Sequence, residues 1–201
     1  PSSFRSIEAD IATFEPERRY ELILANPPFV PTPEGIEGTL TSNGGPEGNR
    51  FVEILLRRLE ELLEPHGEAL ILAFQFVRRQ QPLLVDLISS LLVRRPVELT
   101  PSQKHPIGFE AYCRAYTQLF PGAREEIARW RSALLEEHGE ELTLCHYVAR
   151  VGARGERPTS CVIRDDFAEK FGESFLVPSE NESETSIGRV FENVVPGLDH
   201  R

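Results

Sequence analysis

The sequence predicts an α/β fold in which buried strands alternate with amphipathic helices. Two apolar runs, at residues 22–25 and within the segment 68–74, are continuous rather than alternating, which is typical of strands covered on both faces. A further observation is the order of the segments, because strand, helix, strand, helix and strand follow one another up to residue 100. This order favours a parallel sheet connected by right-handed crossover helices.

The first predicted strand, "YELILAN" at residues 20–26, leads into a polar segment rich in glycine and proline. The next stretch, "NRFVEILLRRLEELLEPHG", carries an apolar stripe at helical spacing and is the clearest helix of the chain. Asn49 is expected to be its N-cap, and Glu53 and Arg57 are spaced for an i,i+4 ion pair. Pro65 should end this helix before the second strand begins.

A second helix is predicted for "PLLVDLISSLLVRR", with Pro82 in its first turn, and the short strand "PVELT" follows it. Residues 102–139 then return to helical spacing, which predicts a helical insertion ahead of the last strand. That strand, "EELTLCHYVARVG" at residues 140–152, has the period-two pattern of a strand near the sheet edge.

The length of 201 residues suits one globular domain, and we assign residues 1–157 to it and residues 158–201 to an acidic C-terminal extension. Residues 165–201 hold nine acidic and three basic side chains, which is −6 of the formal net charge of −10. Because this charge does not attract a phosphate backbone, a nucleic acid partner is disfavoured. The chain contains no methionine, even at position 1, so we expect it to be part of a longer protein.

Other features of the composition exclude several kinds of protein. The three cysteines, Cys113, Cys145 and Cys161, are far apart and form no C-x-x-C pair, so neither a disulfide framework nor a cysteine zinc site is indicated. No apolar run is long enough to span a bilayer, and the first residues lack the basic and apolar regions of a secretory leader. We therefore expect a cytoplasmic protein without a membrane partner, whose oligomeric state the sequence leaves open.

The motif with the clearest chemical meaning is "NPPF", Asn26 to Phe29, at the end of the first predicted strand. Ligands of open α/β sheets bind at the carboxyl ends of the strands. The two prolines fix the backbone, so the Asn26 side chain and the carbonyls of Asn26 and Pro27 form a rigid set of acceptors. Such acceptors suit a planar NH₂ group, on which Phe29 can stack. The alternative is a strand end that prolines merely terminate.

With the segments around it, this motif resembles the catalytic motif of class I S-adenosylmethionine-dependent methyltransferases that modify amide or exocyclic amino nitrogens. Residues 7–76 are most similar to the HemK family of glutamine methyltransferases and to related small methyltransferase domains. The resemblance implies a Rossmann-like sheet, of which this chain holds the C-terminal portion. Its strands would be parallel, with a final antiparallel edge strand and an inserted helical segment.

The resemblance also implies a role for each residue of the motif. Asn26 and the carbonyl of Pro27 would accept hydrogen bonds from the target NH₂ group. Pro28 would complete the rigid motif, and Phe29 would stack on the target. Many HemK proteins carry tyrosine where this chain has Phe29, and phenylalanine is commoner among relatives that act on nucleobases. The methyl acceptor therefore stays open between a protein glutamine, a small molecule and a nucleobase, with the acidic charge favouring the first two.

For the cofactor, the resemblance implies that Asp10 contacts the adenine amino group of S-adenosylmethionine and that Asn26 lies beside it. Gly44 and Gly45 of "GGPEG" would cap the substrate side. No acidic loop of the D/E-x-G-x-G-x-G kind occurs in the chain, so we expect weak cofactor binding by these residues alone. The competing hypothesis is a truncated or degenerate methyltransferase module that acts as a non-catalytic interaction domain.

Overall fold

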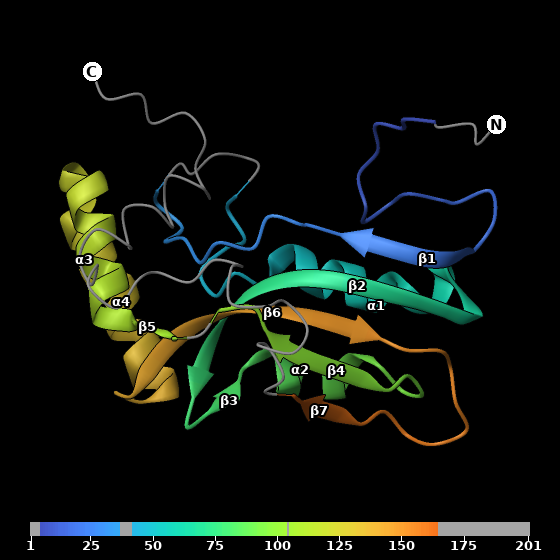
Figure 1. The fold of residues 1–201 in the computed structure, drawn as a ribbon. Coiled ribbons are helices and arrows are strands. Elements are labelled where there is room, and N and C mark those ends of the chain that lie inside the picture. The colour runs from blue at the N-terminus through green and yellow to red at the C-terminus, as the bar shows by residue number, and fades with distance from the viewer. Residues whose placement is uncertain (1–4, 37–41, 104, 165–201) are drawn as a thin grey trace.

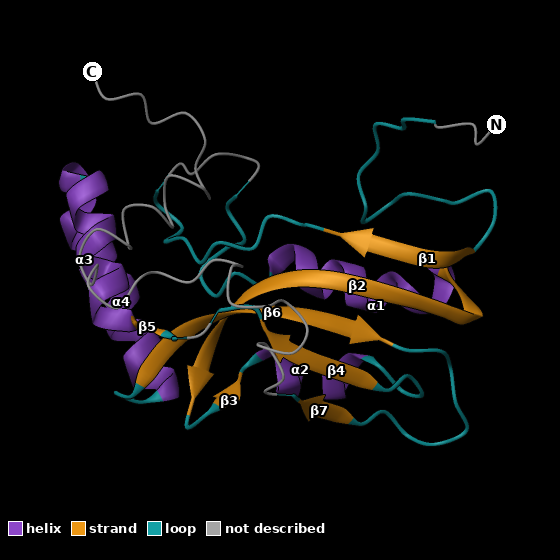
Figure 2. Ribbon diagram, viewed as in Figure 1, coloured by secondary structure: helices purple, strands orange, loops and turns teal. Residues whose placement is uncertain are grey.

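The computed structural model of this chain describes residues 5–36, 42–103 and 105–164. These residues form a mixed sheet that is flanked by helices (Figures 1 and 2). In chain order, the elements are β1 (Tyr20–Ala25), α1 (Arg50–Leu62), β2 (Leu63–Arg78), β3 (Gln81–Pro82), α2 (Leu84–Leu91), β4 (Val97–Pro101), β5 (Ile107–Gly108), α3 (Phe109–Leu119), the 3-10 helix η1 (Pro121–Ala123), α4 (Arg124–His138), β6 (Leu142–Val151) and β7 (Cys161–Ile163).

The main strands lie in the order β1-β2-β6-β4-β7. Strands β1, β2, β4 and β7 run in one direction, and β6 runs antiparallel to both of its neighbours. The predicted α/β class is confirmed, but the expectation that the antiparallel strand lies at the edge is wrong. The polar side chains of β6 suggested solvent, yet His146 is half-buried and stacks on Phe74 of the neighbouring strand.

One face of the sheet is covered by α1 and α2, as Figure 1 shows behind the strands. Their apolar stripes pack on the side chains of β2, β4 and β6 that point toward them and form the larger core. Helices α3 and α4 form a second core with the last residues of β2 and the first residues of β6. There Phe76 packs against Phe109 and Trp130. None of the helices in the described ranges is both long and apolar enough to cross a membrane.

Strand β1 forms an open edge of the described sheet, because it pairs with β2 on one side only. Its alternate residues Ile23 and Ala25 pack against the larger core. Leu22 and Leu24 point the other way and are 55% and 70% exposed. A strand that the sequence predicts to be covered on both faces is thus covered on one face by the described residues.

Helix α1 follows the prediction closely, with differences at its two ends. Asn49 occupies the N-cap position but makes no capping hydrogen bond with its side chain. The Arg57–Glu53 ion pair is present at 2.6 Å. The helix passes directly into β2 at Leu63, so Pro65 lies within the strand and does not end the helix. Pro82 similarly lies in β3, just before α2 rather than in its first turn.

The C-terminal part of the described chain belongs to the sheet. Strand β7 pairs in parallel with β4, and the Val97 amide bonds to the Ser160 carbonyl at 2.8 Å. The sheet therefore continues past residue 157, where the sequence analysis placed the start of the acidic extension. Residues 165–201 lie outside the described residues.

Candidate functional site

The Asn-Pro-Pro-Phe segment directly follows Ala25, the last residue of β1, at the carboxyl end of the parallel β1–β2 pair. Asn26 is exposed, and Pro27, Pro28 and Phe29 are half-buried. Within the described residues no hydrogen bond engages the Asn26 carboxamide, so it is free to bind a ligand. The structure places the motif where an α/β sheet binds ligands.

The glycine-rich segment predicted to lie near the motif packs directly against the chain that follows it. The Val30 amide donates to the Ser42 carbonyl at 2.8 Å, and the Gly44 amide donates to the Val30 carbonyl at 2.9 Å. The Thr32 amide donates to the Gly45 carbonyl at 2.9 Å. This short parallel ladder fixes the direction in which the backbone leaves Phe29.

Three glycines are required for this close packing. A side chain on Gly44 would place its Cβ 2.8 Å from the Phe29 carbonyl carbon, and one on Gly48 would lie 2.4 Å from the Phe29 oxygen. Gly45 and Gly48 also have positive φ angles of 85° and 77°, which favour glycine. Gly44 and Gly45 are buried, so the described structure gives them a structural role, and their predicted substrate contact stays a prediction.

Helix α3, from the predicted insertion, holds the same segment from the other side. The Tyr112 hydroxyl donates to the Pro31 carbonyl at 2.9 Å, and the hydroxyls of Thr32 and Tyr116 lie 3.0 Å apart. Burial raises the pKa of Tyr112 well above its ordinary value, so this hydroxyl stays protonated. The inserted helices therefore contribute to positioning the residues that follow the motif.

The structure adds His146 to the candidate site, a residue that the sequence analysis treated only as part of a strand. Its ring stacks on Phe74 at a centroid distance of 4.1 Å and meets Phe29 edge to face at 5.6 Å. Burial lowers its pKa to about 4, so the imidazole is neutral at physiological pH. The β2–β6 register pairs Phe74 with His146, and one sequence alone does not reveal which strands pair.

Asp10 is the predicted site residue that the structure does not connect to the motif. Its carboxylate accepts the Ala12 amide at 2.9 Å, and its carbonyl accepts the Phe14 amide at 2.8 Å, so Asp10 forms a local turn. Arg58 of α1 holds this turn through the carbonyls of residues 11, 12 and 14. Asp10 is exposed, and no hydrogen bond or ion pair of the described residues links it to Asn26.

A second group of polar residues lies where α4 ends. His138, the last residue of α4, contacts Glu47 of the glycine-rich segment, with 2.9 Å between the imidazole Nε2 and a carboxylate oxygen. Trp130 of the same helix donates its indole N–H to the Pro46 carbonyl at 3.0 Å. Helix α4 and the segment beside Phe29 are thereby joined at two points.

No protein family model matches the chain, and no curated protein matches it significantly. The functional interpretation therefore depends on the site itself and on the resemblance of its motif.

The residues present match one side of a methyltransferase site better than the other. Asn26 is exposed at the end of β1 and is followed by Pro27 and Phe29, whereas Asp10 is engaged in a local turn and the chain contains no G-x-G sequence. These residues do not make up a full pocket for S-adenosylmethionine. The Asn26 carboxamide oxygen and the Pro27 carbonyl are groups that can accept hydrogen bonds from a planar NH₂ group.

Proposed function

We propose that this chain carries the acceptor-binding part of an S-adenosylmethionine-dependent methyltransferase that acts on a planar NH₂ nitrogen. The observation that carries the proposal is an Asn-Pro-Pro-Phe segment at the carboxyl end of a parallel strand, with Asn26 exposed and the residues after Phe29 held by a glycine-rich ladder. A strand end that prolines merely terminate has no need of such a ladder.

The residues of the chain would contribute positioning and electrostatic stabilisation. The Asn26 carboxamide oxygen and the Pro27 carbonyl accept the two N–H groups of the acceptor, which leaves the nitrogen lone pair directed away from them. The same two oxygens stabilise positive charge that develops on the nitrogen. Phe29, supported by His146, covers one face of the planar group. The cofactor, when bound, supplies an electrophilic methyl group.

The acceptor is proposed to be a protein glutamine or a small amide or amine, with a nucleobase as the less favoured class. A net charge of −10 gives the chain no general attraction for nucleic acid. Methyl transfer from labelled S-adenosylmethionine to a glutamine peptide, to a small primary amide and to a purine nucleoside would separate these classes.

The variant Asn26→Ala in the full-length protein tests the proposal. It should lose methyl transfer by about 10²- to 10³-fold, because one acceptor of the developing charge is gone. Its melting temperature should not change, because Asn26 is exposed. Glu21→Ala, an exposed position of the same strand, is the matched control and should keep its activity. Full activity of Asn26→Ala would show the proposal to be wrong.

One observation favours the second candidate function, an interaction module without catalysis. Leu22 and Leu24 of β1 and Leu70 and Leu72 of β2 are all exposed on the sheet, and the β1–β2 register pairs Leu24 with Leu70. Calorimetric titration of the full-length protein with S-adenosylmethionine discriminates the two candidates. Binding supports the enzyme, and a protein that neither binds the cofactor nor transfers methyl groups supports the module.

A further inference from the structure

Three side chains that ligate metals in other proteins meet at the junction of α4 and the glycine-rich segment. Glu47, Glu137 and His138 each offer one ligand atom, and these atoms lie within 4.8 Å of one another. The His138 Nε2 atom is 2.9 Å from Glu47 and 3.9 Å from Glu137. Oxygen and nitrogen ligands of one ion at about 2.0 to 2.2 Å require this degree of proximity.

One imidazole faces two carboxylates at this junction, and Glu137 is too far from Nε2 to share a hydrogen bond with it. The cluster also lies at the carboxyl end of α4, a helix of 15 residues whose dipole favours a cation there. Arg78 and Arg79 line the adjoining space, so the proposal depends on the arrangement of the ligand atoms and not on an excess of negative charge.

Asn49 lies beside the first of these ligands. Its side-chain nitrogen is 3.4 Å from a Glu47 carboxylate oxygen, so the carboxamide nitrogen is the group that faces the cluster. The Asn49 side-chain oxygen is enclosed and has no hydrogen-bond partner among the described residues. Asn49 therefore helps to hold Glu47 in place and is not one of the proposed ligands.

Two of the three ligands are held before any ion binds. The His138 side chain is only 10% exposed, and the backbone on either side of Glu47 is fixed by the Trp130–Pro46 hydrogen bond and by Gly48. Glu137 is 68% exposed, so its side chain is the one that has to become ordered when an ion binds. Two of the three ligands are therefore preorganised, which lowers the entropic cost of binding.

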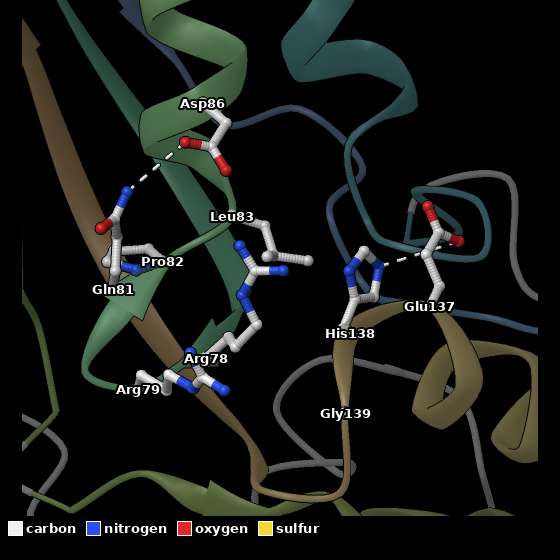
Figure 3. A pocket seen from close by; sticks show the side chains of 9 residues that line it. All are labelled: Arg78, Arg79, Gln81, Pro82, Leu83, Asp86, Glu137, His138 and Gly139. Atoms are coloured by element: carbon white, nitrogen blue, oxygen red, sulfur yellow. Dashed lines mark hydrogen bonds and ion pairs between the residues drawn. The ribbon is translucent and has the colours of Figure 1, made fainter.

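The cluster opens onto a pocket of about 490 Å³ that Asn49, Glu53 and Arg78 also line. An adjoining pocket of about 420 Å³ has Arg78 and Arg79 facing His138, as Figure 3 shows. Arg78 is the last residue of β2, and Arg79 begins the turn that follows, where Arg79 and Gln80 adopt positive φ angles of 50° and 66°. A metal at the cluster would keep a coordination position open toward this space.

We propose that Glu47, Glu137 and His138 bind a divalent transition-metal ion, with Zn²⁺ as the best match to one imidazole and two carboxylates. Imidazole nitrogen and carboxylate oxygen both ligate zinc, and three protein ligands leave a fourth position for water or another exchangeable ligand. The ion would connect the end of α4 to the segment that packs on Phe29. The proposal does not depend on the methyltransferase hypothesis, because no residue of the motif is a ligand.

Binding of Zn²⁺ and Co²⁺ to the metal-free full-length protein tests this site. The wild-type protein should bind one equivalent of Zn²⁺ in calorimetry and should melt at a higher temperature when loaded. His138→Gln and Glu47→Gln should each weaken binding by about tenfold or more, and Co²⁺ should give a visible absorption band that both variants lose.

The matched control is His66→Gln, because His66 and Glu21 form a comparable but fully surface-exposed pair at 4.0 Å. This variant should keep the Zn²⁺ affinity and the Co²⁺ band of the wild-type protein. Circular dichroism shows whether His138→Gln remains folded, and Glu137→Gln provides a second ligand variant at an exposed position. Absence of binding to the wild-type protein, or binding that none of the three ligand variants weakens, would overturn the proposal.

Discussion

His146 lies in β6 with its imidazole between Phe74 and Phe29, and this environment decides its protonation state. Burial lowers its pKa from an ordinary value of 6.5 to about 4. In the unfolded chain the same side chain titrates near 6.5. Between these two values the unfolded state binds more protons than the folded state, so the free energy of unfolding must fall as the pH falls.

The variant His146→Phe should remove this pH dependence. The wild-type protein should lose about 2 kcal/mol of stability from this residue between pH 7 and pH 5, because its imidazole stays neutral in the fold. A phenylalanine can stack on Phe74 but does not titrate. Urea unfolding of both proteins at the two pH values measures the difference. Parallel losses in wild type and variant would contradict the expectation.

At the scale of elements, the glycine-rich segment decides the geometry of the motif. Its ladder with residues 30–32, its contacts with Phe29 and its hydrogen bond from Trp130 join three elements that are far apart in the sequence. The segment therefore connects α4 to the residues that follow the motif.

Gly48→Ala tests this role. Its Cβ would lie 2.4 Å from the Phe29 oxygen at a φ of 77°, so the protein should lose at least about 2 kcal/mol of stability. Gly122→Ala is the control, since nothing lies within 4 Å of a Cβ at that position. This control should stay within about 0.5 kcal/mol of wild type. Chemical denaturation measures the free energy of unfolding of both variants. Equal values would show that the segment accommodates a Cβ at position 48 and would contradict this role.

At the scale of the whole molecule, Arg95 connects three elements around the larger core. Its side chain is 1% exposed and donates to the carbonyls of Gly67, Gly152 and Glu64 and to the Glu60 carboxylate. These acceptors belong to the end of α1, the start of β2 and the residue after β6. One guanidinium therefore satisfies the polar groups where three elements converge.

Arg95→Met should destabilise the protein by about 3 to 5 kcal/mol, because it leaves buried acceptors without a donor. Arg94→Met, at the neighbouring exposed position, is the matched control and should have little effect. Thermal unfolding followed by circular dichroism provides the comparison. A loss of stability no larger than that of Arg94→Met would contradict the assigned role of Arg95.

Much of this molecule follows from local sequence pattern, and the remainder depends on which strands and loops meet. The stripe of α1, the strand β1 and the place of Asn26 at a strand end are local and were predicted correctly, whereas the predicted burial of β1 on both faces was wrong for the described residues. The interior position of β6, the contact of His146 with Phe29 and the approach of His138 to Glu47 arise from pairing across long stretches of chain. Periodicity alone carries no information on such pairs.

The open edge of β1 has a consequence for the order in which the sheet comes apart. β1 is bound through β2 alone, while β2, β6 and β4 form a continuous antiparallel centre. Amide protons of β1 should exchange with solvent faster than those of the centre, because a strand with one neighbour can detach without opening the rest. Asn26 and Pro27, which follow β1, are therefore carried by an edge strand that opens before the centre, and brief detachment of this edge would displace them while the core stays folded.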